Sequence, residues 1–159
     1  MREWYDQKYF NDMEVYAQNS AVRNARRLAK YQPESVLDVG CGHGYLVENL
    51  LKRGIEAWGT DWVDFARRRI PDNFIQAYAD KLPFGDKSFD VVVSTDFLEH
   101  IPEEEVEKVF SEMVRIARRK VLALINFDRR ETDKERDTHI TLKPKHWWIQ
   151  KCRGIEFLR

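Results

Sequence analysis

Short apolar runs alternate along the chain with segments in which apolar residues recur every three or four positions. Short, β-rich runs are typical of buried strands, and the 3.6-residue spacing is typical of helices. Strands are expected over residues 36–39, 55–60, 74–79, 89–95, 120–127 and 155–158. Helices are expected over residues 45–52, 62–69, 102–119 and 145–151. This alternation predicts an α/β protein whose parallel sheet is covered on both faces.

The first 32 residues predict a helical cover over that sheet. Ser20 is positioned to begin a helix that ends before Pro33, and an aromatic-rich helix is expected in front of it. No repeat, linker or low-complexity tract divides the chain. We therefore expect one domain over residues 1–159, with 1–32 as a helical lid and 33–159 as the α/β core.

Composition narrows the functional classes. Of the 159 residues, 43% are hydrophobic and 34% charged, and 27 basic residues balance 27 acidic ones. The formal net charge is therefore zero, so the protein as a whole has no positive electrostatic potential that would attract nucleic acid or anionic lipid. The N-terminus lacks the apolar block of a secretory signal, and no run approaches the roughly 18 apolar residues of a membrane span. The two cysteines match neither a disulfide framework nor a zinc site, which predicts a reducing, cytoplasmic setting.

A glycine-rich turn follows the first core strand. Residues 36–44 read Val-Leu-Asp-Val-Gly-Cys-Gly-His-Gly, a strand running into Gly-x-Gly-x-Gly and then a helix. Glycines allow a sharp turn and close approach of a ligand, and the helix N-terminus offers free N–H groups. The third glycine comes one position earlier than in the dinucleotide fingerprint, so the spacing fits hydride-transfer cofactors poorly.

Acidic residues end the next two predicted strands. Asp61 follows Gly40 by 21 residues, the separation at which a carboxylate reaches the ribose hydroxyls of a nucleoside cofactor. Trp62 could lie against an adenine face, and Asp80 could accept a hydrogen bond from an exocyclic amine. For Asp80 an ordinary polar strand end is the alternative. Together with the glycine turn, these residues predict a nucleoside pocket.

These residues resemble the class I S-adenosylmethionine-dependent methyltransferases, in their small-molecule branch. Residues 36–44 look like the family's first motif, residues 79–84 and 88–92 like its adenine-binding segment and fourth strand, and residues 98–101 like its post-strand motif. The resemblance implies a Rossmann-like doubly wound sheet, mainly parallel, in the order 3-2-1-4-5-6. The family's usual final antiparallel strand is expected to be missing, which would expose a sheet edge for a homodimer.

The same resemblance implies a set of cofactor-binding residues for S-adenosylmethionine. They are Asp38, Gly40, Cys41, Gly42, Gly44, Asp61, Trp62, Asp80, Lys81, Leu82 and Ser94. In similar enzymes an aromatic residue of an N-terminal lid closes over the cofactor, a role open here to Tyr5 or Tyr9.

Methyl transfer needs a nucleophile held in line with the S–CH₃ bond and a group that takes its proton. His100 is the expected base, because its unperturbed pKa lies near neutrality, with a packing or capping role as the alternative. Asp96 is the second catalytic candidate. We expect O-methylation of a small-molecule or glycan acceptor. The alternative from a different class is a partner or regulatory subunit that binds S-adenosylmethionine without catalysis.

Nucleic acid is an unlikely acceptor from the sequence. Residues 94–97 read Ser-Thr-Asp-Phe and lack the Asn/Asp-Pro-Pro-aromatic signature of amino-group DNA methyltransferases. The arginine clusters at 67–69, 118–119 and 129–130 alternate with acids, which favours an ion-paired surface.

A metal-assisted mechanism is a further alternative. If a helical turn follows the fourth strand, Asp96, Glu99 and His100 share one side of it, and His139 could reach the same mouth. This set resembles the Glu-x-x-Glu-His…His site of small-RNA 2′-O-methyltransferases, with Asp96 one methylene shorter. Without such an ion, His100 acts alone.

Overall fold

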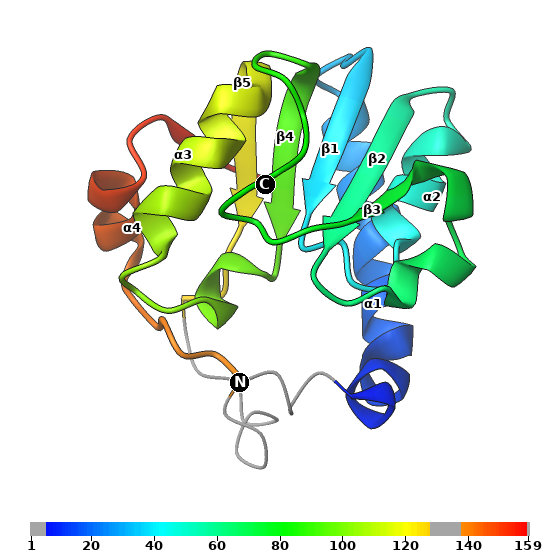
Figure 1. The fold of residues 1–159 in the computed structure, drawn as a ribbon, viewed down its shortest axis with the longest axis horizontal. Coiled ribbons are helices and arrows are strands. Elements are labelled where there is room, and N and C mark those ends of the chain that lie inside the picture. Colours follow the sequence, from blue (N-terminus) through cyan, green and yellow to red (C-terminus); the bar gives the residue numbers. More distant parts are fainter. Residues whose placement is uncertain (1–5, 128–137, 159) are drawn as a thin grey trace.

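Six strands form one parallel sheet in the computed structural model, which describes residues 6–127 and 138–158 (Figure 1). The strand order is β3-β2-β1-β4-β5-β6, and every neighbouring pair is parallel. The strands are β1 (Ser35–Val39), β2 (Glu56–Asp61), β3 (Phe74–Gln76), β4 (Phe89–Thr95), β5 (Ala117–Leu124) and β6 (Ile155–Phe157). The predicted fold class and order are confirmed, and no antiparallel strand is present in the described part of the chain.

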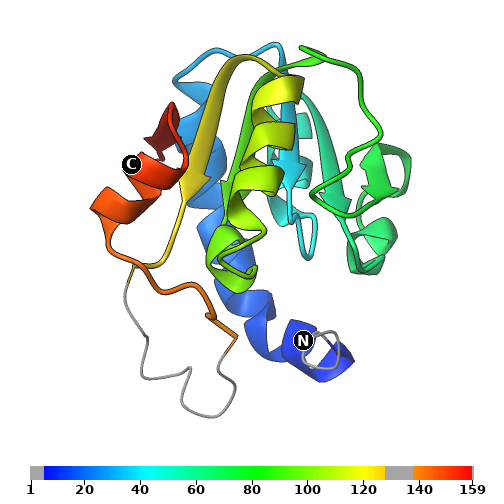
Figure 2. The ribbon, with the colours of Figure 1, turned by 60° about the vertical axis from the view of Figure 1, so that its left-hand side comes forward.

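Helices cover both faces of this sheet (Figures 1 and 2). They are α1 (Gln7–Ala29), α2 (Tyr45–Leu51), α3 (Val106–Ile116) and α4 (Lys145–Lys151). Helices α1 and α2 pack on one face, while α3 and α4 pack on the other. Short 3₁₀ turns, η2 (Phe65–Arg68), η3 (Pro71–Asn73) and η4 (Leu98–His100), lie in the connections.

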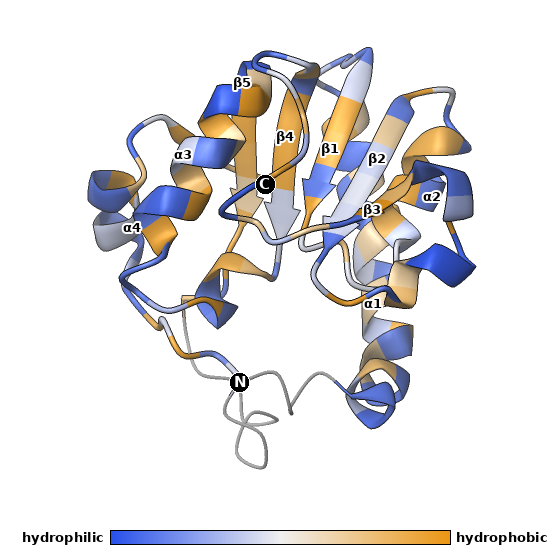
Figure 3. Cartoon of the chain, in the orientation of Figure 1, coloured by the Kyte–Doolittle hydropathy of each residue, from blue (hydrophilic) through white to orange (hydrophobic). Residues whose placement is uncertain are grey.

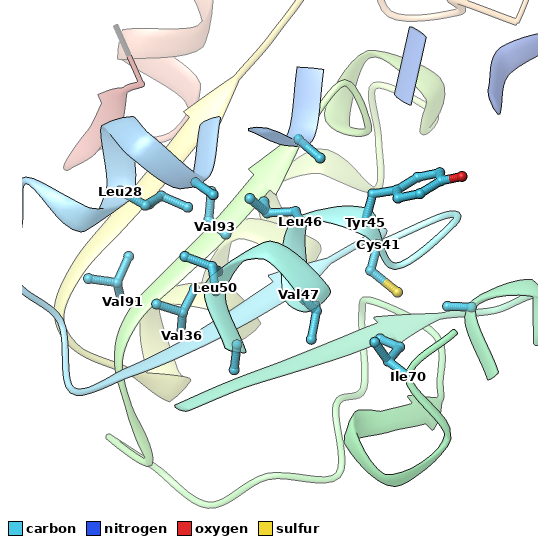
Figure 4. Close-up of a cluster of buried hydrophobic side chains, with 14 of the residues drawn as sticks. Leu28, Val36, Cys41, Tyr45, Leu46, Val47, Leu50, Ile70, Val91 and Val93 are labelled. Atoms are coloured by element: carbon cyan, nitrogen blue, oxygen red, sulfur yellow. The ribbon is translucent and has the colours of Figure 1, made fainter. Parts of the chain in front are cut away.

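The period-two alternation of strand side chains divides the core between these two layers. In β1, Val36 faces α1 and α2, whereas Leu37 and Val39 face α3. Figure 3 shows the apolar band along β1, β4 and β5, and Figure 4 shows Val36 packed with Leu28 of α1 and Leu50 of α2. By the same alternation Asp38 points to the α1 side, which places an acid under that helix.

The N-terminal region differs from the prediction, because α1 is one continuous helix. Ser20 lies in its interior, where its hydroxyl accepts a hydrogen bond from Asn24. The N-cap is Asp6, whose carboxylate accepts from the backbone N–H of Tyr9 at 2.8 Å. No glycine or proline interrupts residues 7–29, so a good capping residue alone did not start a new helix.

Several predicted boundaries were also wrong. β3 ends at Gln76, which pairs with Asp61, the last residue of β2. As an edge strand β3 has only this one partner, so beyond the end of β2 it finds no backbone groups to pair with. Asp80 therefore lies in the following turn and not on a strand end. The expected helix over 62–69 is only the 3₁₀ turn η2, and residues 117–119 begin β5 instead of ending a helix.

The open edge beside β5 is occupied by β6. Its three residues pair with Val121, Leu122 and Ala123. Such a short edge strand offers few unpaired backbone groups to a second copy. Homodimerisation through this edge stays a prediction that light scattering can test. Among the helices of the described residues, none has the length and apolar character that a membrane span needs.

We expect Gly59→Ala to destabilise the fold by about 1–3 kcal/mol. A Cβ at Gly59 would lie 2.8 Å from Sγ and 3.0 Å from Cβ of Cys41, and 3.2 Å from Ile70. Gly85→Ala is the matched control, since nothing lies within 4 Å of its added Cβ and its φ is not positive. Urea unfolding of both variants measures the difference, and equal free energies of unfolding would contradict the close packing of β2 on the glycine turn.

Candidate active site

The turn after β1 depends on glycine. Gly40 has φ +75°, and a Cβ there would lie 2.3 Å from the side chain of Phe97. The backbone N–H groups of Gly40 and Cys41 both donate to the carbonyl of Thr60, at 2.9 and 3.0 Å. The left-handed backbone, the contact with Phe97 and this double hydrogen bond hold the ends of β1, β2 and β4 together.

Asp61, the last residue of β2, fixes the turn from the other side. One carboxylate oxygen accepts from the N–H of Gly42 at 2.9 Å, and the other accepts from Val63 at 3.2 Å. Burial raises the pKa of Asp61 above its usual range, while these hydrogen bonds work to lower it. The predicted ribose-binding acid thus lies directly against the glycine turn.

Asp38 is the second acid of the turn and has a different environment. It is 1% exposed, and its Oδ1 atom is buried with no hydrogen-bond partner. Burial, with a smaller contribution from the charge of Asp61, raises the pKa of Asp38 to about 8. The Asp38 carboxyl is therefore largely protonated at neutral pH.

Two cavities open at the carboxyl ends of the strands. The large cavity, of about 520 Å³, extends from Asp61 and Trp62 to His100 and Glu105. The small cavity, of about 120 Å³, lies between α1 and the glycine turn and contains Asp38. Their shared lining residues are Tyr9, Phe10, Gly40, Gly42 and Asp96. The large cavity has the volume of a small-ligand site.

Nine of the 13 residues predicted to bind the cofactor or act in catalysis line these cavities. Gly40, Gly42 and Asp96 line both, Asp38 and Cys41 line the small one, and Asp61, Trp62, Asp80 and His100 line the large one. Asp80 also forms an ion pair with Lys108, with Nζ and Oδ2 2.6 Å apart.

The other four predicted cofactor residues lie outside both linings. Ser94 is fully buried within β4, and Leu82 is a core residue whose N–H donates to Glu112. Lys81 is exposed. Gly44, with φ +77°, caps α2, and its Cα faces the side chain of Ile70.

Helix α1 contributes Met13, Tyr16 and Ser20, which the sequence did not identify as site residues, beside Tyr9, which it predicted as a lid residue. The hydroxyl of Tyr16 donates to Oδ2 of Asp96 at 3.1 Å, and Asp96 has a positive φ of 50°. Tyr9, Met13, Tyr16 and Ser20 line the small cavity at spacings of four, three and four residues. Continuous helical periodicity from residue 7 was the available signal. Tyr9 lines both cavities, while Tyr5 lies outside the described residues.

His100 follows β4 in the turn η4 and lines the large cavity. It is 9% exposed, and its Nδ1 lies 2.8 Å from the carbonyl oxygen of Thr138. A carbonyl can only accept a hydrogen bond, so Nδ1 carries a proton, and in the neutral imidazole Nε2 is then the nitrogen with the lone pair. This tautomer can accept a proton or bind a cation at Nε2.

Comparison with known proteins identifies the family. A model of the methyltransferase domain family matches residues 37–125, more than half of the chain. The chain belongs to this family. Its members are S-adenosylmethionine-dependent methyltransferases of the class I fold, as the sequence predicted.

Two curated relatives of this methyltransferase domain are O-methyltransferases. The fatty-acid O-methyltransferase of Mycolicibacterium smegmatis is 33% identical over 100 residues, covering 57% of this chain and 35% of the relative. The ubiquinone biosynthesis O-methyltransferase of Photorhabdus laumondii is 32% identical over 85 residues, covering 45% and 34%. The chain thus spans about a third of the length of these relatives.

Solved structures agree with the fold. A SAM-dependent methyltransferase from Archaeoglobus fulgidus is 25% identical with a TM-score of 0.59, over 72% of this chain and 55% of that one. A methyltransferase solved with the Trm112 methyltransferase activator of Haloferax volcanii is 20% identical with a TM-score of 0.71, over 95% and 73%. The second likeness shows the fold alone, and it extends over nearly the whole chain.

The protonated state of Asp38 predicts a pH-dependent stability. Between about pH 4 and pH 8 the folded chain holds a proton on Asp38 that the unfolded chain has released. Stability therefore falls as pH rises through this window, by at most about 1.4 kcal/mol per pH unit. Asp38→Asn removes this titration. We expect its stability relative to the wild type to rise up to about pH 8 and then level off.

Urea unfolding at several pH values measures this difference. Asp72→Asn, at an exposed position of η3, is the matched control and should show a difference independent of pH. A constant difference between Asp38→Asn and the wild type would mean that Asp38 is ionised in the folded protein.

Proposed function

We propose that this domain transfers a methyl group from S-adenosylmethionine to an oxygen atom of a small acceptor with an apolar body. The observation that carries the proposal is the pair of cavities joined at Gly40, Gly42 and Asp96. Acids line both: Asp38 the small cavity and Asp61 the large one. This arrangement suits a ligand with a cationic amine at one end and ribose hydroxyls at the other.

The chain's own residues fit such a ligand. Asp61 would accept hydrogen bonds from the ribose hydroxyls, and Trp62 with Asp80 would frame the adenine. Gly40 and Gly42 leave the backbone open where the methionine part would pass. The buried Oδ1 of Asp38, which lacks a hydrogen-bond partner, would receive the cationic amino group, and Asp38 would release its proton to solvent on binding. When bound, S-adenosylmethionine supplies a sulfonium-activated methyl group.

The rest of the large cavity would hold the acceptor. His100 lies there beside an apolar wall of Ile101, Pro102 and Val109. In the metal-free protein, Nε2 of His100 would take the proton from an acceptor hydroxyl group, whereas a carboxylate acceptor is already ionised and needs no base. Asp96, oriented by Tyr16, would position the reacting groups. The apolar wall favours a small apolar molecule over a glycan, and the O-methyltransferase relatives support oxygen as the nucleophile.

The surface charges support a small molecule over nucleic acid. Arg118 and Arg119 pair with Asp90 at the amino ends of the strands, away from the cavities, and Arg69 pairs with Glu14 and Glu48. Residues 129 and 130 lie outside the described residues. Both cysteines are free and buried, which suits the proposed cytoplasmic location.

Asp61→Ala is expected to weaken binding of S-adenosylmethionine by about 1–3 kcal/mol, roughly 5- to 150-fold, because the ribose hydroxyls lose their buried acceptor. Isothermal titration calorimetry measures the change. Asp72→Ala, at an exposed aspartate outside both cavities, should bind like the wild type. Equal affinities of the wild type and Asp61→Ala would refute the assignment of the ribose site.

Methyl-labelled S-adenosylmethionine tests the reaction directly. We expect label to enter apolar hydroxyl or carboxyl acceptors, either from a defined panel or from fractionated extract. His100→Ala should retain S-adenosylmethionine binding but lower kcat by about 10²–10⁴. His146→Ala, at an exposed position on α4, is the control and should leave kcat unchanged.

The same assay separates the alternative function. A protein that binds S-adenosylmethionine but labels no acceptor would be a binding or regulatory subunit. If RNA is labelled and no small acceptor is, the domain is an RNA 2′-O-methyltransferase and the small-molecule proposal is wrong.

A further inference from the structure

Three metal-ligating side chains converge beside the large cavity. Glu99 and His100 belong to η4 after β4, and His139 belongs to the segment that returns after β5. One ligand atom from each lies within 4.8 Å of the other two. The imidazole centroids of His100 and His139 are 4.6 Å apart. Residues 39 positions apart in sequence thus present their ligand atoms to one point.

All three side chains are buried. Glu99 is 0% exposed, His139 7% and His100 9%. Burial of all three side chains would limit the competition of water with these ligands for a bound ion.

Backbone hydrogen bonds hold the cluster together without any ion. The N–H groups of Ile140 and Thr141 both donate to the carbonyl of Glu99 at 3.0 Å. The hydroxyl of Thr141 donates to the carbonyl of Ile101 at 2.6 Å. The segment carrying His139 is therefore fastened to η4 immediately beyond the histidine, so the ligands are preorganised and need no large rearrangement to bind.

Outer hydrogen bonds orient the ligands as metal sites require. Nδ1–H of His100 donates to the carbonyl of Thr138, which leaves Nε2 as the ligand atom. Oε1 of Glu99 accepts from the N–H of Asn126 at 2.8 Å. Metal-binding histidines usually donate their other ring N–H to a carbonyl or carboxylate in this way.

We propose that Glu99, His100 and His139 bind one divalent transition-metal ion, with Zn²⁺ as the best match. Two imidazoles and one carboxylate form a ligand set that Zn²⁺ accepts, and three protein ligands leave a coordination position open. His100 lines the large cavity, so the open position is accessible to a molecule bound there. The set differs from the four residues considered in the sequence, because Asp96 lies outside this cluster and accepts a hydrogen bond from Tyr16.

The metal site has one consequence for the reaction, and this consequence rests on the proposed function. An acceptor oxygen bound at the open position loses its proton to solvent more readily. The oxygen then forms the bond to the methyl carbon while the C–S bond breaks, and that electron pair stays on sulfur. Nε2 of His100 serves as a ligand in this state and no longer as the base.

Metal binding is tested on the full chain without turnover. After dialysis against a chelator, Co²⁺ alone is titrated into the protein while its visible absorption is recorded, and Zn²⁺ is then added as competitor. We expect one equivalent of Co²⁺ to give the intense bands of a four- or five-coordinate ion, and one equivalent of Zn²⁺ to displace it. His139→Ala should lower the affinity for Co²⁺ by more than about 100-fold. A loss of this size exceeds the roughly 10- to 100-fold effect of removing a hydrogen bond that only orients a ligand.

Two further variants make the result decisive. His146→Ala, an exposed histidine on α4, should bind Co²⁺ like the wild type. If His139→Ala does not fold by circular dichroism, Glu99→Gln provides the same test, since its amide keeps an acceptor for Asn126. No stoichiometric binding to the wild type, or equal binding by the folded site variants, overturns the proposal. Methyl transfer by a metal-free protein at the rate of the metal-loaded protein would overturn only the metal's part in the reaction, and metal binding without transfer would overturn only the proposed function.

Discussion

The ligand-facing end of the molecule depends on the absence of a side chain at Gly40. Without a Cβ, the backbone takes a left-handed conformation and Phe97 packs against it, while two successive N–H groups reach the carbonyl of Thr60. These contacts tie the ends of three neighbouring strands to one point. The positions of Asp38, before the turn, and Asp61, after Thr60, follow from this arrangement.

Two acids at the same turn, Asp38 buried and Asp61 half-buried, serve it in different ways. Asp61 has both oxygens bonded to backbone N–H groups, so it stabilises the turn that it also borders. Asp38 lacks such donors at Oδ1 and holds a proton instead. In the ligand-free protein, Oδ1 of Asp38 is thus a buried polar atom without a hydrogen-bond partner. Departures of this kind from good core packing are typical of functional sites.

The sequence predicted the sheet correctly because strand periodicity and short connections leave few parallel arrangements. It also located the glycine turn and Asp61, which depend on local spacing. It failed where the outcome depended on distant contacts. The end of β3 is set by its partner β2, and the continuous α1 is held by the core contacts of Ala25 and Leu28. No local pattern pairs Tyr16 with Asp96, 80 residues away.

That separation has a consequence for how the site forms during folding. Tyr16 of α1 and Asp96, which follows β4, are brought together across the sheet, whose neighbouring strands are parallel and so cannot be joined by tight turns. Closing such long loops precedes the contacts that reward it, so parallel sheets fold slowly. No single helix or strand supplies the lining of either cavity. Because residues of α1 and of the segments after four different strands line the cavities, ligand binding reports on the assembled sheet.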